Sequence, residues 1–333
     1  MNVEKYILHK AKNKNFTIIF PEAGFSDRII KATKIISKKK IAKVILVGDE
    51  SSLVMRFKNL KKFNIVNPKS SELSSQFAQK LYEYRKDKGM TLEQAQELVL
   101  DPFYFSAMMV KEGYADGMVG GAEVSTSKNL KPALQIIKAK EGLASSCFVI
   151  AGKHKNIELP IFLTDAGLNE NPTSQQLAII AKQTVDTAKS MLGSDIKVAF
   201  LSYSTKGSAE SEMTQKVKDA YQTFANANPE ILCDGELQLD SALIERVAKL
   251  KCPQSPVAGK ANVLVVPDLN AGNILYKCMQ YFGGLTAIGP IVQGLNKPVN
   301  DLSRGCSIKD IVLLTAVTVL QCENNKNNKE NKQ

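Results

Sequence analysis

The chain has 333 residues, of which 44% are hydrophobic and 23% charged, and its formal net charge is +11. This composition excludes a disordered or fibrous chain, and the length predicts one large or two ordinary domains. No apolar run reaches the roughly 20 residues that cross a bilayer, and the first residues lack the pattern of a secretory signal. We therefore expect a cytoplasmic protein that does not bind membranes.

Short strand-like runs alternate with segments of helical period along the chain. The first series is "FTIIF", a helix over 26–39, "KVILVG", a second helix, "FNIV", helices to about 112, and "GMVGG". The second series is "LPIFLTD", a helix over about 173–191, "KVAFLSY", a helix over 209–226, "NVLVVPD", a helix from about 271, and "GPIVQG". This alternation predicts an α/β protein with two units, each a mostly parallel sheet flanked by helices. The pattern breaks near 140, where we expect the domain seam.

Local sequence patterns predict where several helices begin and how the chain ends. Thr91 with Gln94, and Thr173 with Gln176, have the spacing of a capping box, and Asp101 precedes Pro102 as an N-cap. The last apolar run, "DIVLLTAVTVLQ", predicts a buried helix. The polar residues 323–333 that follow it predict a disordered tail.

Several kinds of site are disfavoured by what the sequence lacks. The only histidines, His9 and His154, lie in polar segments, which disfavours a Ser-His-Asp or Cys-His relay. The six cysteines are scattered without CxxC spacing, so we expect no metal site and no disulfides. Neither the GxxxxGK[ST] phosphate loop nor a GxGxxG motif is present. The lysines form no stripe with interleaved aromatics, which disfavours nucleic acid and leaves a small anionic substrate as the expected ligand.

Two polar turns follow predicted strands, where open α/β sheets bind ligands. The first, residues 120–129, includes Ser125, Thr126 and Lys128, and the second, residues 202–211, includes Ser204, Thr205 and Lys206. Backbone donors at a helix start can hold a phosphate in either turn. Each turn can equally be an ordinary helix cap.

A third polar stretch, "KPVNDLSRGCSIKD", covers residues 297–310. Ser307 and Asp310 have the spacing of a capping box, which predicts the start of the last helix. Ser303 and Arg304 precede Gly305 in a turn beside that helix start, where an anion would be stabilised, and Asp310 would be a nearby proton acceptor. A surface turn without chemistry is the alternative for Ser303 and Arg304, and the two roles of Asp310 are compatible.

These segments carry a family resemblance. "GPIVQGLNKPVNDLSRGCSIKDIV", "DGELQLDSAL", "SPVAGKANVLVVPDLNAGNILYK" and "PEAGFSDRIIKAT" resemble the phosphate acetyltransferase (phosphotransacetylase) family, a similarity that covers nearly the whole chain. The resemblance implies reversible acetyl transfer between coenzyme A and inorganic phosphate in a direct ternary complex. Coenzyme A and acetyl-CoA would be substrates, with no permanently bound cofactor.

The resemblance also assigns roles to residues. Asp310 would be the base for the CoA thiol, Ser303 would bond to the transferring phosphate, and Arg304 would hold substrate oxygens. Arg85 matches a further arginine of the family, and Lys131 stands where the family usually has arginine. A lysine keeps the charge but loses the two-pronged grip on phosphate, so we expect a weaker anchor there. Cys306 is an alternative nucleophile without a histidine partner.

The domain organisation implied by the family has residues 1–141 and 291–333 in a discontinuous first domain and residues 142–290 in an inserted second one. The substrate cleft would lie between them, as in isocitrate and isopropylmalate dehydrogenases, and two copies would pair through the second domain as a homodimer. There are two competing functions. The protein could transfer a propionyl or butyryl group, or it could be a binding module without catalysis.

Overall fold

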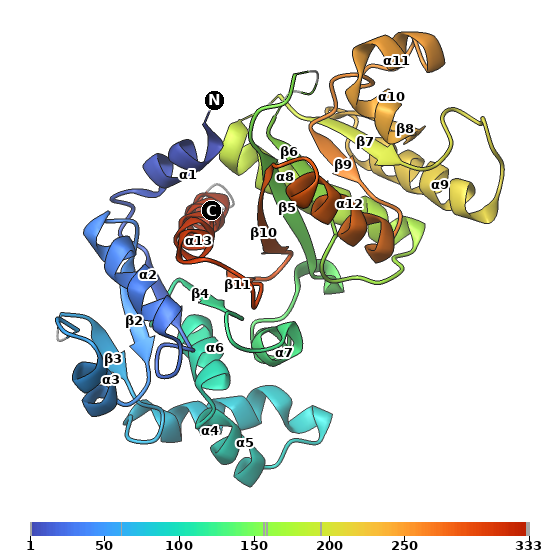
Figure 1. Cartoon of the computed structure of the whole chain (residues 1–333). Helices are drawn as coiled ribbons and strands as arrows, with labels where there is room; N and C mark the ends of the chain where they lie inside the picture. The colour runs from blue at the N-terminus through green and yellow to red at the C-terminus, as the bar shows by residue number, and fades with distance from the viewer. Residues whose placement is uncertain (1, 61, 156, 158, 194, 331–333) are drawn as a thin grey trace. The chain divides into compact units, whose positions relative to one another are not determined.

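The structure is a computed structural model that describes residues 2–60, 62–155, 157, 159–193 and 195–330. The contacts divide the chain into two compact units (Figure 1). The first unit comprises Ile7–Gly142 and Leu295–Gln333, and the second comprises Met1–Tyr6 and Leu143–Gly294. The division differs from the expected one mainly at the amino end, where Thr286 Oγ1 donates to Glu4 Oε1 at 3.3 Å within the second unit.

The first unit is built on a five-stranded sheet in the order β11-β4-β1-β2-β3, with every neighbouring pair parallel. The central strand is almost wholly buried, and its "TIIF" sequence is β-branched and aromatic as such a position favours. The strands are β1 (Thr17–Phe20), β2 (Lys43–Val47), β3 (Asn64–Val66), β4 (Gly117–Gly120) and β11 (Val299–Asp301).

Helices cover this sheet, and α13 contacts both β4 and α2 (Figure 1). Capping fixes several of their starts: Thr91 and Gln94 form a capping box, and Asp101 Oδ1 accepts from the Phe103 and Tyr104 amides. The helices of this unit are α2 (Asp27–Lys38), α3 (Glu50–Arg56), α4 (Leu73–Arg85), η1 (Lys86–Lys88), α5 (Leu92–Val99), α6 (Pro102–Glu112), α7 (Thr126–Ile136), η2 (Lys140–Gly142) and α13 (Ile308–Glu330). Helix α1 (Val3–Ala11) is divided between the units after Tyr6.

The second unit has a six-stranded sheet in the order β10-β5-β6-β9-β7-β8. Its β6-β9, β9-β7 and β7-β8 pairs are parallel, whereas β10 and β5 add antiparallel pairs at one edge. The strands are β5 (Ser145–Ala151), β6 (Ile161–Thr164), β7 (Lys197–Leu201), β8 (Leu232–Leu237), β9 (Val263–Val265) and β10 (Thr286–Gln293).

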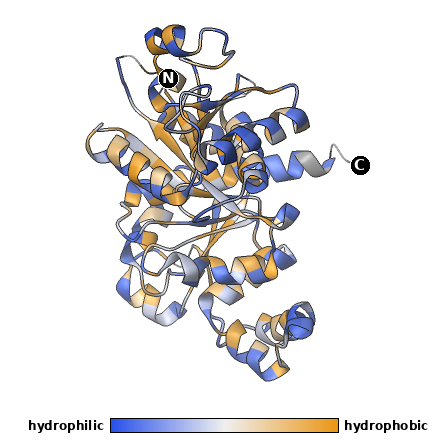
Figure 2. Cartoon of the chain, turned by 90° about the vertical axis from the view of Figure 1, so that its right-hand side faces the viewer, coloured by the Kyte–Doolittle hydropathy of each residue, from blue (hydrophilic) through white to orange (hydrophobic). Residues whose placement is uncertain are grey.

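The helices of the second unit pack on this sheet, where Figure 2 shows hydrophobic residues concentrated in the strands. Thr173 and Gln176 form the capping box expected at the start of α8. Gly272 lets α12 approach closely, since a Cβ there would lie 2.9 Å from Val266 Cγ2. The helices are α8 (Ser174–Leu192), α9 (Glu212–Ala227), α10 (Leu239–Leu243), α11 (Glu245–Lys251) and α12 (Leu269–Tyr281).

The prediction of an α/β fold with two mostly parallel sheets is confirmed. The prediction of a disordered tail over 323–333 is wrong for residues 323–330, which continue α13, while 331–333 lie outside the described residues. The run "ENNKNNKE" stays helical because it extends an anchored helix. Adding a residue to an existing helix costs less conformational entropy than starting a new helix.

Candidate functional site

The candidate site of the first unit lies where β4 and β11 end. These neighbouring strands are parallel, with Asp301 of β11 paired to Gly120 of β4. Leu302 N donates to Gly120 O at 2.7 Å, which keeps the two chains together one residue beyond the ladder. The turn that carries Ser303 and Arg304 therefore emerges beside the loop that leads into α7, at the edge where parallel sheets bind ligands.

Asp301 joins these two segments through its buried carboxylate. Its Oδ2 accepts from Thr126 Oγ1 at 2.6 Å, and its Oδ1 accepts from Asn129 Nδ2 at 2.9 Å. Thr126 and Asn129 both lie in the first turn of α7, and Asp301 is 1% exposed. Burial raises the pKa of Asp301 to about 6, although both hydrogen bonds oppose the shift.

Close packing at this point requires glycine. Gly121 has φ +95°, a left-handed conformation that L-residues rarely adopt. A Cβ at Gly121 would lie 2.2 Å from Asp301 Oδ1. The loop can approach the carboxylate only because this side chain is absent.

A second buried carboxylate, that of Glu22, holds the same loop. Its oxygens accept from the backbone amides of Ala122 and Glu123, each at 2.8 Å. Burial raises the pKa of Glu22, while these backbone hydrogen bonds act to lower it. The β4–α7 loop is thus held by two buried acids that come from segments distant in sequence.

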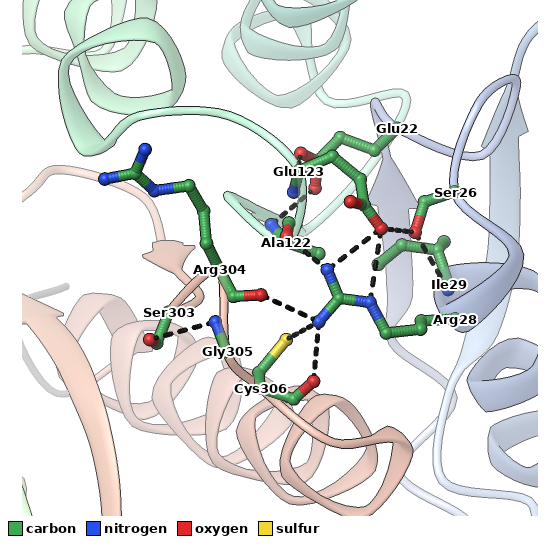
Figure 3. A network of polar contacts seen from close by, with 10 residues as sticks. All are labelled: Glu22, Ser26, Arg28, Ile29, Ala122, Glu123, Ser303, Arg304, Gly305 and Cys306. Carbon is green, nitrogen blue, oxygen red and sulfur yellow. Dashed lines mark hydrogen bonds and ion pairs between the residues drawn. The ribbon is translucent and has the colours of Figure 1, made fainter.

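Arg28 ties this loop to the Ser303–Arg304 turn, as Figure 3 shows. Its guanidinium donates to Ala122 O at 2.5 Å and pairs with Glu123 Oε1 at 2.9 Å. The same group donates to Arg304 O at 2.9 Å and to Cys306 O at 2.7 Å. Ser26 Oγ, the N-cap of α2, also donates to Glu123 Oε1 at 2.7 Å. One planar cation therefore links α2, the loop and the turn.

Ser303 and Arg304 are both exposed to solvent. Ser303 Oγ accepts from Gly305 N at 3.3 Å, and Cys306 N donates to Ser303 O at 2.8 Å. The side chain of Arg304 extends away from Arg28 (Figure 3) and makes no hydrogen bond or ion pair with a described residue. The hydroxyl and the guanidinium remain available to a ligand.

Asp310 caps α13 as its spacing predicts. Its Oδ2 accepts from Ser307 N and from Ser307 Oγ, both at 2.8 Å, and Ser307 Oγ accepts from Asp310 N at 3.2 Å. Oδ1 accepts no hydrogen bond from the part of the chain that the structure describes. One oxygen thus holds the helix start while the other is available.

Cys306 is unsuited to act as a nucleophile. It is 7% exposed, and burial raises the pKa of its thiol to about 11 although Arg28 opposes the shift. Arg28 Nη1 lies 3.6 Å from Sγ, so a cation does stand beside the thiol. The thiol stays protonated at neutral pH, which is the inert state.

Other predicted residues of this unit lie on α4 and α7. Arg85 ends α4, and its Nε is buried without a hydrogen-bond partner among the described residues. Ser125 is the N-cap of α7 and accepts from Lys128 N at 3.3 Å. Lys131 is exposed on α7, whereas Lys128 pairs with Asp101. Arg85 and Lys131 therefore have charged groups without a carboxylate partner among the described residues, whereas the charge of Lys128 is paired.

Ser204, Thr205 and Lys206 belong to the second unit, and their contacts there are internal. Ser204 Oγ donates to Glu236 Oε1 at 2.7 Å, and Thr205 Oγ1 accepts from Gln238 N at 2.9 Å. Lys206 pairs with Asp234 and donates to Gly235 O at 3.2 Å. These bonds give the turn a structural role, and the substrate role of the three residues stays a prediction.

Arg28, Glu22 and Asp301 were not among the residues predicted from sequence. Their partners lie far away in the chain, as with Arg28 and Arg304, so no local spacing reveals them. The one available signal is that charged residues sit after a buried strand at "PEAGFSDR" and at the last position of a buried strand at "VND". No group of three or more His, Cys, Asp or Glu in the described ranges is placed to hold a metal ion, and no helix there is long and apolar enough to cross a membrane.

The raised pKa of Asp301 predicts a pH-dependent stability. Between about pH 4 and 6 the folded protein keeps a proton that the unfolded chain releases, so the free energy of unfolding falls as pH rises and levels off above about 6. A shift of roughly two units corresponds to about 3 kcal/mol. Urea unfolding from pH 4.5 to 7.5 should therefore show a clearly shallower pH slope in Asp301→Asn. The exposed Asp87→Asn should keep the wild-type slope, and equal slopes in all three proteins would refute this role.

Comparisons with known proteins identify the family of the chain. The family model described as phosphate acetyl/butaryl transferase matches residues 2–319. The phosphate acetyltransferase of Thermoanaerobacterium thermosaccharolyticum is 46% identical over 97% of this chain and 100% of its own length, and that of Clostridium acetobutylicum is 45% identical over 97% and 99%.

Solved structures give the same result. A phosphotransacetylase from Streptococcus pyogenes has a TM-score of 0.90 at 40% identity, covering 96% of this chain and 98% of its own. A 4-hydroxythreonine-4-phosphate dehydrogenase from Klebsiella pneumoniae shares the fold at 11% identity with a TM-score of 0.53, covering 93% and 99%. With a family model that spans nearly the whole chain and relatives above 40% identity, this chain belongs to the phosphate acetyl/butaryl transferase family.

Proposed function

We propose that the protein transfers an acetyl group reversibly between coenzyme A and inorganic phosphate. The observation that carries the proposal is the turn after β11, where Arg28 fixes the backbone while the O–H donor of Ser303 and the Arg304 guanidinium have no partner among the described residues. The names of the relatives support acetyl as the group transferred. Coenzyme A, acetyl-CoA, phosphate and acetyl phosphate are all anionic, which suits the net charge of +11.

The proposed reaction is a direct transfer within a ternary complex. Asp310 Oδ1 takes the proton of the CoA thiol while Oδ2 stays bonded to Ser307. The thiolate attacks the carbonyl carbon of acetyl phosphate, the tetrahedral oxyanion collapses, and phosphate leaves with its electron pair. The high pKa of the Cys306 thiol supports this route over one through an acetyl-cysteine.

Arg304 and Ser303 stabilise the charge that develops on the carbonyl and phosphate oxygens. Donors held in place before the reaction are effective because they need not reorganise as charge moves. Arg85 and Lys131 would add positive charge for the phosphates of coenzyme A, and the buried Nε of Arg85, which has no partner in the described part of the chain, supports that role. A buried donor without a partner costs free energy, which a bound phosphate would recover.

We also propose the type of fold that binds the substrates, the absence of a bound cofactor and the location of the protein in the cell. We propose that the fold is of the isocitrate and isopropylmalate dehydrogenase type, and the fold shared with a distant dehydrogenase supports this. Coenzyme A is a substrate and no cofactor is permanently bound. The proposed location is the cytoplasm, where acetyl-CoA is available.

Replacing the free donors tests the reaction. Arg304→Ala and Ser303→Ala should each lower kcat by about 100-fold to 1,000-fold, because each removes a donor aimed at developing charge. Release of the CoA thiol from acetyl-CoA with phosphate as acceptor measures this. Cys306→Ala should keep near-normal turnover as the matched change in the same turn.

The same assay separates the alternatives. Wild-type protein that releases no CoA in a phosphate-dependent way would contradict catalysis and favour a binding module. A kcat/KM for butyryl-CoA above that for acetyl-CoA would assign the longer acyl group.

Arg28 should matter for turnover without touching the reacting atoms. Arg28→Lys keeps the charge but cannot reach the carbonyls of Ala122, Arg304 and Cys306 together. A displacement of about 1 Å in a catalytic group can cost about 100-fold, so we expect kcat to fall by roughly 10-fold to 100-fold. Arg56→Lys, which alters a guanidinium bonded to Gly24 O and Asp27, is the control. Equal kcat values in the two variants would contradict the role of Arg28.

We further propose that the protein is a homodimer that pairs through α12 of the second unit. Gly272 is the only buried residue of that helix, while Ile274, Tyr281 and Phe282 are 63%, 77% and 91% exposed. Large apolar side chains left this exposed on and just after one helix mark an interface more often than a solvated face. Large aromatic side chains also contribute strongly to protein–protein contacts.

Charge on this surface should weaken pairing. Phe282→Asp should raise the dimer dissociation constant by at least about 30-fold, the effect expected for an interface hot spot. Sedimentation equilibrium measures it, and Leu250→Asp, an equally polar change at a 75% exposed residue of α11, should have little effect. A monomeric wild type, or a Phe282→Asp variant that pairs normally, would overturn the proposal.

A further inference from the structure

Two adjoining hollows lie at the amino ends of the strands of the first unit. One of about 450 Å³ is lined by residues that include Asn15, Lys43 and Asn64, which stand at or just before the starts of β1, β2 and β3. The other, of about 710 Å³, is lined by the ends of α1 and α2. Asn13 and Lys40 line both hollows, so the two form one continuous depression, here called the lysine hollow.

The lysine hollow is strongly cationic. No aspartate or glutamate lines it, and none of its lysines forms an ion pair with a residue in the described part of the chain. By contrast, the adjacent Lys14 pairs with Glu323 at 2.5 Å. The lysines that line it are Lys12, Lys38, Lys39, Lys40, Lys43 and Lys62.

Helix capping accounts for only part of this charge. The carboxyl ends of α1 and α2 lie here, and lysines commonly offset the partial negative charge of a helix end. That partial charge is about −0.5 for each helix, so the two ends offset about one of the six positive charges. Most of the charge therefore has no counterpart among the residues that the structure describes.

Uncharged donors line the same depression. Asn13, Asn15 and Asn64 present amide groups and Ser37 a hydroxyl, and none of these side chains bonds to a described residue. Asn13 and Lys40 adopt left-handed backbones with φ of 59° and 55°, and Asn13 N donates to Lys40 O at 2.9 Å. Amides and ammonium groups together are the donors that suit phosphate oxygens.

We propose that the lysine hollow binds a small molecule with two or three linked phosphates, either a nucleotide or an inorganic polyphosphate. A concave site of this volume suits a compact ligand. A nucleic-acid strand would need a groove with stacking aromatics, and Phe63 is the one aromatic residue that lines the hollow. The site is separate from the one that holds Ser303 and Arg304, because that one lies at the carboxyl ends of strands of the same parallel sheet.

Isothermal titration calorimetry with sodium tripolyphosphate at about 50 mM salt, where charge interactions are weakly screened, tests the proposal. We expect one molecule bound per chain by the wild type. The double variant Lys40→Gln, Lys43→Gln should bind at least about tenfold more weakly, because it removes two charged donors. Lys153→Gln with Lys155→Gln, which removes the same charge outside the hollow, should bind within about twofold of the wild type, and so should Arg304→Ala.

Three outcomes would overturn the proposal. One is that the wild type binds no tripolyphosphate. Another is that the Lys153 and Lys155 control binds as weakly as the Lys40 and Lys43 variant, which would show an effect of net charge alone. The third is that Arg304→Ala loses tripolyphosphate binding while the Lys40 and Lys43 variant keeps it, which would place the anion in the acetyl-transfer site. A parallel titration with ATP separates the two sources: affinity at or above that of tripolyphosphate indicates a nucleotide, and affinity more than tenfold lower indicates the inorganic chain.

Discussion

The guanidinium of Arg28 is the constraint on which the geometry of the site depends. It binds backbone carbonyls on two segments that are about 180 residues apart, Ala122 on one side and Arg304 and Cys306 on the other. Hydrogen bonds to a charged donor contribute about 1.5–3 kcal/mol each, more than neutral ones. A turn of exposed residues would otherwise sample many conformations, and this one is held at its backbone so that its side chains stay free.

The acids around Arg28 complete the arrangement. Glu22 holds the amides of the β4–α7 loop, and Asp301 holds the first turn of α7, so both sides of the loop are fixed. Gly121 makes the close approach to Asp301 possible. The loop, the helix start and the turn thus form one rigid edge, as catalysis by donors in fixed positions requires.

The sequence predicted those parts of this structure that depend on near neighbours. The capping boxes at Thr91, Thr173 and Ser307 are present because each needs only residues three apart. Strands β5, β8 and β11 were not predicted, since their patterns are short or uniformly buried and pairing decides them. The roles of Arg28 and Asp301 were likewise out of reach because their partners are brought together only by the fold.

A double-mutant cycle on kcat with Arg28→Lys and Arg304→Ala tests most directly whether Arg28 acts through the turn. If Arg28 serves to hold the Arg304 side chain in place, Arg28→Lys should cost much less once that side chain is absent, with a coupling free energy of at least about 1 kcal/mol. Effects of the two changes that add to within about 0.5 kcal/mol would contradict the account, since they would show that Arg28 and Arg304 act independently.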